Sequence, residues 1–150
     1  MPVPLSKIKK MMKIAYFDCF SGAAGDMIIG ALLDAGLELS ALKRELKKLP
    51  LSGYEIKAFK AEKQGIKGTK FEVKSPPEKT HRNLKDIFKI IEKSSLDKRI
   101  KEDSKKIFKR SAEAEAKVHG VNIDKIHFHE VGGVDAIIDI VGAVIGLDIL

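Results

Sequence analysis

The amino-acid sequence predicts an α+β or α/β fold, in which a small mixed sheet with a β-hairpin is covered by about five helices. The 150-residue chain contains 44% hydrophobic and 33% charged residues, a composition typical of one globular domain. Apolar residues recur at helical spacing in several segments, and they alternate with polar residues in one pair of segments. Glycines and prolines separate these segments, as expected for turns and linkers.

The first half of the chain is predicted to contain one strand, two helices and a hairpin. Ser21-Gly22 follows an apolar, aromatic-rich run and indicates a tight turn at the end of the first strand. Gly36 is suited to end the first helix, and Ser40 is suited to cap the second. The predicted elements are a buried strand over 13–20, helices over 26–36 and 40–48, and an antiparallel hairpin over 54–74.

The second half begins after a linker-like stretch at 75–80, where two prolines disfavour both helix and strand pairing. Asn83 is suited to cap the helix that follows, and Gly120 to end the next one. The predicted elements are helices over 83–91, from 96 or 97 to about 119 and from 135 to 150, and a strand over 123–131. We expect strands over 13–19 and 125–130 to lie in the core of the sheet.

The end of the chain predicts that more sequence follows it, and a truncation, a split gene or a contact with another subunit would each explain the pattern. The last four residues leave an apolar helix without polar capping or a solvating tail. Residues 1–11 are predicted to be a leader, either an upstream extension or a disordered segment, because Met12 opens the first strand.

The charge pattern argues against specific nucleic-acid binding. The net charge is +7, but 28 basic and 21 acidic residues are interspersed, so the field of the molecule is diluted. Arginine reads bases and clamps phosphates in a bidentate manner, and only four basic residues are arginine, namely Arg44, Arg82, Arg99 and Arg110.

The cysteine count and the apolar segments indicate a cytoplasmic protein that does not span a membrane. A single cysteine, Cys19, excludes an intramolecular disulfide and a zinc site built from cysteines. The start of the chain lacks an apolar stretch of signal-peptide length. The apolar run at 131–150 contains Asp135, Asp139 and Asp148, each of which would cost about 2.5 kcal/mol or more in a bilayer.

A first candidate site lies where the first strand turns into a helix. Backbone N–H groups at such a turn can bind a phosphate. Asp18 ends the strand, at the position where α/β proteins hold ligands. Asp26 would repel an anion unless a divalent cation lay between them, and the alternative is that it only caps the helix. The predicted phosphate- or nucleotide-binding residues are Asp18, Ser21, Gly22, Gly25 and Asp26.

A second candidate site surrounds two histidines. On a strand, His127 and His129 project to the same face, where their imidazoles can hold a metal ion. Glu130 points away unless the glycine turn after it reorients the carboxylate. Asp135 and Asp139 share one face of the next helix, and Asp135 is near enough in sequence to approach the histidines. The alternative is a pair of half-buried structural histidines, with Asp135 as a helix cap.

The two motifs together resemble the signatures of the LarC-type nickel insertion proteins of nickel-pincer nucleotide cofactor synthesis. The first block runs from Phe17 to Met27 and continues from Gly30 to Gly36. The second contains His127-Phe128-His129-Glu130-Val131-Gly132, followed by Asp135 and the segment 138–142. The resemblance extends over about residues 12–150, and it implies that this segment is the N-terminal domain of a longer protein.

The resemblance implies a function for the complete protein. By this resemblance, the complete protein is expected to deliver nickel to the thiocarboxylated pyridinium mononucleotide. It would form nickel–carbon and nickel–sulfur bonds, in a lyase reaction that consumes CTP with magnesium or manganese. The resemblance also implies a C-terminal domain that this chain lacks, so the fragment alone can be inactive. Together with the preference of nickel for imidazole and carboxylate ligands, it predicts His127 and His129 as ligands, completed by Glu130, Asp135 or His81. We expect a homo-oligomer in the cytoplasm.

Two other functions remain open at the level of the sequence. The chain can be a structural or oligomerisation module with inert histidines, because Gly142 and Gly146 lie four apart and permit close helix packing. It can also be a metal-dependent phosphoester hydrolase in which the histidine pair, Asp18 and Asp26 hold an ion that activates water.

Overall fold

A computed structural model describes residues 13–76, 82–128 and 131–150 of the chain. Its helices are α1 (Gly25–Asp34), α2 (Leu39–Leu46), α3 (Leu84–Lys93), α4 (Lys98–His119) and α5 (Val134–Ile149), with a single 3-10 turn at Ile123–Lys125. Its strands are β1 (Glu55–Lys63), β2 (Ile66–Lys74), β3 (Arg82–Asn83) and β4 (His127–Phe128). The predicted α+β class, the five helices and the hairpin are confirmed.

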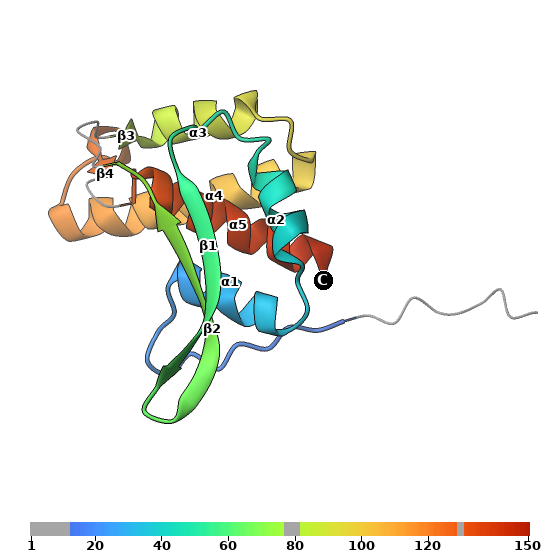
Figure 1. The fold of residues 1–150 in the computed structure, drawn as a ribbon. Coiled ribbons are helices and arrows are strands. Elements are labelled where there is room, and N and C mark those ends of the chain that lie inside the picture. The colour runs from blue at the N-terminus through green and yellow to red at the C-terminus, as the bar shows by residue number, and fades with distance from the viewer. Residues whose placement is uncertain (1–12, 77–81, 129–130) are drawn as a thin grey trace, which may run out of the picture.

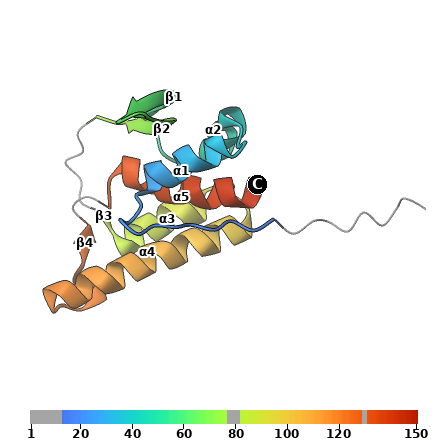
Figure 2. The ribbon, with the colours of Figure 1, turned by 90° about the horizontal axis from the view of Figure 1, so that it is seen from below.

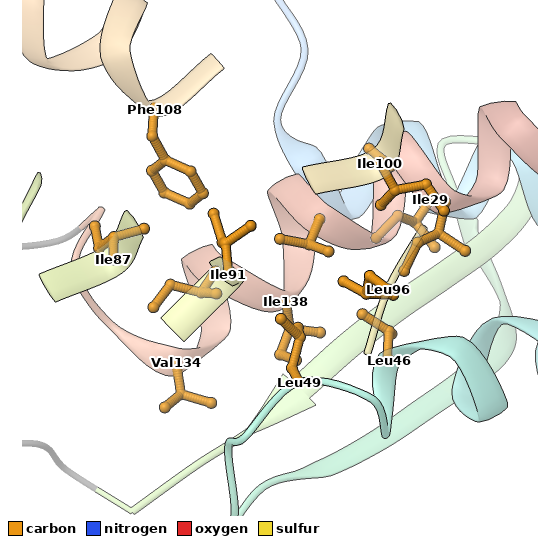
Figure 3. Packing of buried hydrophobic residues seen from close by; sticks show 14 of the residues in the cluster. Ile29, Leu46, Leu49, Ile87, Ile91, Leu96, Ile100, Phe108, Val134 and Ile138 are labelled. Atoms are coloured by element: carbon orange, nitrogen blue, oxygen red, sulfur yellow. The ribbon is translucent and has the colours of Figure 1, made fainter. Parts of the chain in front are cut away.

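Helix α5 is the centre of the molecule. It packs against α1, α2 and α4 and also contacts β2 (Figure 1). In Figure 2 the hairpin of β1 and β2 lies on one side of α5 and α1, and helices α3 and α4 lie on the other. Figure 3 shows apolar side chains from all five helices facing this interior, including Ile29, Leu46, Ile91, Phe108 and Ile138. Among the described residues, no helix is long and apolar enough to cross a membrane.

Helices α1 and α5 run parallel and in very close contact. A Cβ atom added to Gly142 would lie 2.9 Å from Cδ1 of Ile29, and one added to Gly146 would lie 2.8 Å from Cδ1 of Leu32. These pairs advance in the same direction along both helices, so the N-terminal ends of α1 and α5 lie at the same end of the molecule (Figure 1). The prediction that Gly142 and Gly146 permit close packing is therefore confirmed.

The hairpin is attached to α1 through a glycine and a polar network. A Cβ atom on Gly30 would lie 2.3 Å from the carbonyl oxygen of Thr69, so only glycine lets the helix approach the strand this closely. At the end of α1, the Asp34 carboxylate accepts hydrogen bonds from the backbone N–H (2.9 Å) and the hydroxyl (2.6 Å) of Thr69. It also forms an ion pair with Lys60.

Most predicted helix ends are confirmed. Asn83 and Asp86 form a reciprocal capping box at the start of α3. Asp97 caps α4, whose end is closed by Gly120 in a left-handed conformation. The predicted cap at Ser40 is wrong, because α2 begins one residue earlier, and its N-cap is Glu38 without a side-chain hydrogen bond.

The predicted mixed sheet is replaced by two separate antiparallel pairs. Strand β1 pairs with β2, and the short β3 pairs with β4. Residues 13–19 are not in a strand and are exposed, so the prediction that they lie buried in a sheet core is wrong. Within the strand predicted over 123–131, residues 123–125 form a 3-10 turn and 127–128 form β4, while residues 129–130 lie outside the described part of the chain. An apolar run signals burial, but the segment over 13–19 has no strand beside it among the described residues.

Candidate site at the N-terminal ends of α1 and α5

The two sequence motifs meet where α1 and α5 begin. Gly25, the first residue of α1, lies directly against α5, and a Cβ atom on it would stand 2.7 Å from Cβ of Asp139. Because the two helices are parallel, both positive dipole ends point to this region. The structure therefore joins the glycine turn before α1 to the segment that follows the histidines.

Asp139 lies at this junction, and its carboxylate is half-buried. Its Oδ1 atom is buried and has no hydrogen-bond partner within the described part of the chain. Burial, as the largest cause, and the nearby carboxylates of Asp26 and Asp135 together raise the pKa of Asp139 to about 7, although the backbone N–H of Asp26 acts in the opposite direction. A carboxyl group with this pKa is divided between its neutral and ionised forms near neutral pH.

Asp26 stands in the first turn of α1 and does not cap the helix. Residue Ala24 occupies the N-cap position and makes no side-chain hydrogen bond. The Oδ1 atom of Asp26 accepts a 2.8 Å hydrogen bond from the backbone N–H of Met27. The alternative in which Asp26 is the capping residue is therefore wrong, although its carboxylate does satisfy one amide of the first turn.

The turn before α1 confirms the local prediction for Ser21-Gly22. The N–H of Gly22 donates a 3.0 Å hydrogen bond to the carbonyl of Cys19, and Gly22 has a φ of +82°, which favours glycine. Asp18, Ser21 and Gly22 line a shallow hollow of about 340 Å³ between this segment and α1. The rest of the lining is mostly apolar and includes Phe17, Phe20, Met27, Ile28 and Ala31.

The structure thus divides the predicted phosphate-binding residues into two groups. Asp18, Ser21 and Gly22 border the hollow, whereas Gly25 and Asp26 face α5. At Gly25 the absence of a side chain is needed for helix packing, so any contact of this residue with a phosphate would have to come from its backbone N–H.

The described part of the histidine motif, His127 and Phe128, forms the short strand β4. His127 pairs with Asn83, and Phe128 pairs with Arg82. The Nη1 atom of Arg82 donates a 2.8 Å hydrogen bond to the carbonyl of Gly132, which fixes the turn between β4 and α5. A Cβ atom on Gly132 would lie 3.0 Å from the carbonyl oxygen of Phe128, so a side chain at this position would crowd the backbone of β4.

Only part of the predicted metal site can be placed. Asp135 is exposed in the first turn of α5, near Asp139. The side chain of His127 and the residues His81, His129 and Glu130 lie outside what the structure describes. Among the described side chains, no three His, Cys, Asp or Glu residues form a group that could hold a metal ion. Asp26, Asp135 and Asp139 are near one another without forming such a group.

From the sequence, Asp139 shares a helix face with Asp135, but it is not among the predicted site residues. One signal in the sequence indicates a role for Asp139. Carboxylates are rarely buried without a partner, and Asp139 lies in the strongly apolar segment 134–146. Its partner across the interface, Gly25, could be identified only once the packing of α1 on α5 was known.

Comparison with known proteins assigns the family. The model of a family described as "Nickel insertion protein" matches residues 15–150. This chain belongs to the nickel insertion protein family. A relative from Desulfitobacterium hafniense (strain DSM 10664 / DCB-2), named pyridinium-3,5-bisthiocarboxylic acid mononucleotide nickel insertion protein, is 56% identical over 135 residues, which are 90% of this chain and 34% of the relative.

Two further nickel insertion proteins show the same extent of similarity. One from Geobacter sp. (strain M21) is 53% identical over 93% of this chain and 36% of its own length. One from Dictyoglomus thermophilum is 48% identical over the same shares. The chain therefore spans about a third of the length of the relatives it matches. No solved structure matches it significantly.

Proposed function

We propose that this chain is the nickel-handling region of a protein that delivers nickel to pyridinium-3,5-bisthiocarboxylic acid mononucleotide, forming the nickel-pincer cofactor. The observation that supports this most strongly is the convergence of both motifs at the N-terminal ends of α1 and α5. The name of the Desulfitobacterium hafniense relative supports the choice of substrate. Nickel is a substrate in this reaction.

The donor set of the motifs is suited to nickel. Divalent nickel accepts imidazole and carboxylate ligands, and the second motif supplies both. We propose His127, His129, Glu130 and Asp135 as its ligands. The ionised form of Asp139 would add negative charge beside Asp135, and a divalent cation would offset the mutual repulsion of these carboxylates.

The first motif is suited to the phosphate of the mononucleotide. The N-terminal ends of two parallel helices together favour an anion. We propose that Ser21, Gly22 and Gly25 contact the phosphate through backbone or hydroxyl donors, and that Asp18 and Asp26 act through a cation. The adjoining apolar hollow can accept the flat face of a pyridinium ring.

The remaining steps are assigned to the complete protein. We propose that a C-terminal domain, in the part of the relatives that this chain does not match, uses CTP with magnesium or manganese, and that the complete protein is a homo-oligomer in the cytoplasm. The single cysteine supports the cytoplasmic location.

Calorimetric titration of the metal-stripped chain with nickel tests the proposal, with zinc and magnesium for comparison. We expect nickel binding in the micromolar range or tighter. The double substitution His127→Ala/His129→Ala should weaken it by about 100-fold or more, because both imidazoles are lost. His119→Ala is the matched control, since His119 lies outside both motifs and pairs with Glu115 at the end of α4. Equal affinity in the double variant and the parent would overturn the ligand assignment.

The phosphate site is tested separately with nicotinic acid mononucleotide, a pyridinium mononucleotide. We expect it to raise the melting temperature of the chain, because a ligand that binds only the folded state stabilises it. Ser21→Ala should reduce that shift, while Ser95→Ala, at an exposed serine far from the motif in sequence, should not. Absence of any shift at millimolar concentration would count against a phosphate site in this region.

A further inference from the structure

The segment before α1 is apolar and exposed. Residues 13–24 are all exposed, and the exposed fractions of Ile14, Tyr16 and Phe20 are 82%, 87% and 94%. Such side chains are scattered singly on most protein surfaces, whereas here three of them occur within seven residues. This concentration indicates a surface that is covered in the complete protein.

The residue pattern of this segment is that of a β-strand. Ile14, Tyr16 and Phe20 share one face of an extended chain, while Phe17, on the other face, is only 44% exposed and lines the hollow beside α1. Aromatic and β-branched residues favour strands. The segment nevertheless lacks strand pairing to any described residue.

The hairpin in this chain is not the partner of the segment. In Figures 1 and 2 the segment, drawn in blue, runs antiparallel to α1, and Figure 2 shows α1 between the segment and the pair of β1 and β2. Within the described part of the chain, β1 and β2 pair only with each other. A partner strand must therefore come from outside the described residues.

The relatives supply a source for that strand. About two thirds of their length lies outside the part that this chain matches, and the matched part is their N-terminal region. Both views place the end of α5 near the start of the exposed segment (Figures 1 and 2). A chain that continues from α5 and turns back would run in the same direction as residues 14–20, as in a strand–helix–strand unit.

We propose that residues 14–20 form a β-strand that pairs, in parallel, with a strand from the region that follows α5 in the full-length family members. This inference goes beyond the proposed function and does not depend on it. The pairing would hold Asp18, which lies within the strand, and the turn at Ser21-Gly22, which directly follows it, rigidly beside the start of α1.

Hydrogen exchange of backbone amides tests the pairing. We would compare the 150-residue chain with a chimera that joins it to the unmatched remainder of the Desulfitobacterium hafniense relative. Amides of residues 15–20 should exchange without protection in the 150-residue chain and at least about 100-fold more slowly in the chimera. If the chimera does not unfold cooperatively, the intact relative replaces it, and the equivalent amides should be protected there.

A pair of substitutions with matched exposure provides the control. Tyr16 is 87% exposed and Val118, on α4, is 81% exposed. Tyr16→Asp should lower the melting temperature of the chimera by several degrees, while Val118→Asp should leave it unchanged. Neither should affect the 150-residue chain.

Two results would overturn the proposal. One is rapid exchange of residues 15–20 in the chimera and of the equivalent residues in the intact relative. The other is protection of these amides already in the 150-residue chain together with the mass of a dimer, which would make a second copy the partner.

Discussion

Asp139 and Asp34 show how local surroundings move the pKa of a carboxyl group in opposite directions. Burial near two other carboxylates raises the pKa of Asp139 to about 7. The hydrogen-bonded ion pair with Lys60 and the two hydrogen bonds that Thr69 donates lower the pKa of Asp34 to about 2. The first group therefore opposes folding when it is ionised, and the second supports folding when it is ionised.

We expect Asp139→Asn to stabilise the metal-free chain at pH 8 and to have little effect at pH 4. The pKa of Asp139 rises from 3.8 to about 7 on folding, so stability is lost as the pH rises between these values. The gain at pH 8 should be on the order of 1–2 kcal/mol after allowance for partial exposure and solvent screening.

Urea unfolding at the two pH values measures this effect. Asp124→Asn is the control, because Asp124 is an exposed partner of Lys85 at 3.4 Å and should change stability little at either pH. A loss of stability in the Asp139 variant at pH 8 would show that the ionised carboxylate is held by favourable contacts.

Asp34→Asn should destabilise the chain at pH 7 and lose this effect in acid. The pKa of Asp34 falls from 3.8 to about 2 on folding, so its contribution is present above pH 3.8 and disappears as the pH falls through 2. Thermal unfolding between pH 2 and pH 7 follows the change. Glu62→Gln, on the same hairpin, is the control. Glu62 lies 3.9 Å from the ammonium group of Lys67, so its loss should have a much smaller effect on stability.

At the scale of elements, the position of α1 depends on glycines that face different kinds of atom. Gly30 faces a backbone carbonyl of β2, whereas Gly146 faces the ends of the Leu32 and Leu37 side chains. A flexible side chain can move aside more easily than a strand. The loss of stability on adding a methyl group should therefore differ between these sites. The gain in helix propensity from glycine to alanine, about 1 kcal/mol, is the same at both.

We expect Gly30→Ala to destabilise the chain by about 2 kcal/mol or more, because its Cβ would lie 2.3 Å from the carbonyl oxygen of Thr69. Gly146→Ala should be nearly neutral, since helix propensity offsets the displacement of two leucine side chains. Chemical denaturation of both variants measures the difference. Equal effects would contradict the close contact of α1 with β2.

At the scale of the whole molecule, α5 holds the other elements together. Eight of its residues are buried, and it contacts α1, α2, α4 and β2. The site depends on the same helix, because its first turn follows the histidine motif and its second presents Asp139 to Gly25. Stability and site geometry are therefore coupled through one element.

A chain that ends at Gly133, before α5, should not unfold cooperatively. It would expose the apolar surfaces of α1, α2 and α4 that now pack on α5, and these supply much of the core. Near-ultraviolet circular dichroism and thermal unfolding report the loss. Removal of residues 148–150, of which Asp148 and Ile149 are exposed, should retain the cooperative transition.

Local patterns were sufficient to predict most elements. The capping box at Asn83, the left-handed Gly120 and the period-two hairpin depend on neighbouring residues, so they follow from the sequence. The strand expected over 13–19 did not form with the described residues, because a strand also needs a partner and a pattern does not supply one. The expected cap at Ser40 failed for a smaller reason, since α2 begins one residue before it.

The sequence by itself determined the family, the α+β class and the two motifs, because these depend on residue type and spacing along the chain. Only the tertiary structure decided that the motifs meet, since their contact depends on α1 and α5 packing in parallel. It also showed why Gly25 has no side chain and why the pKa of Asp139 is raised. Burial and the proximity of like charges are properties of the packed chain, and no local pattern specifies them.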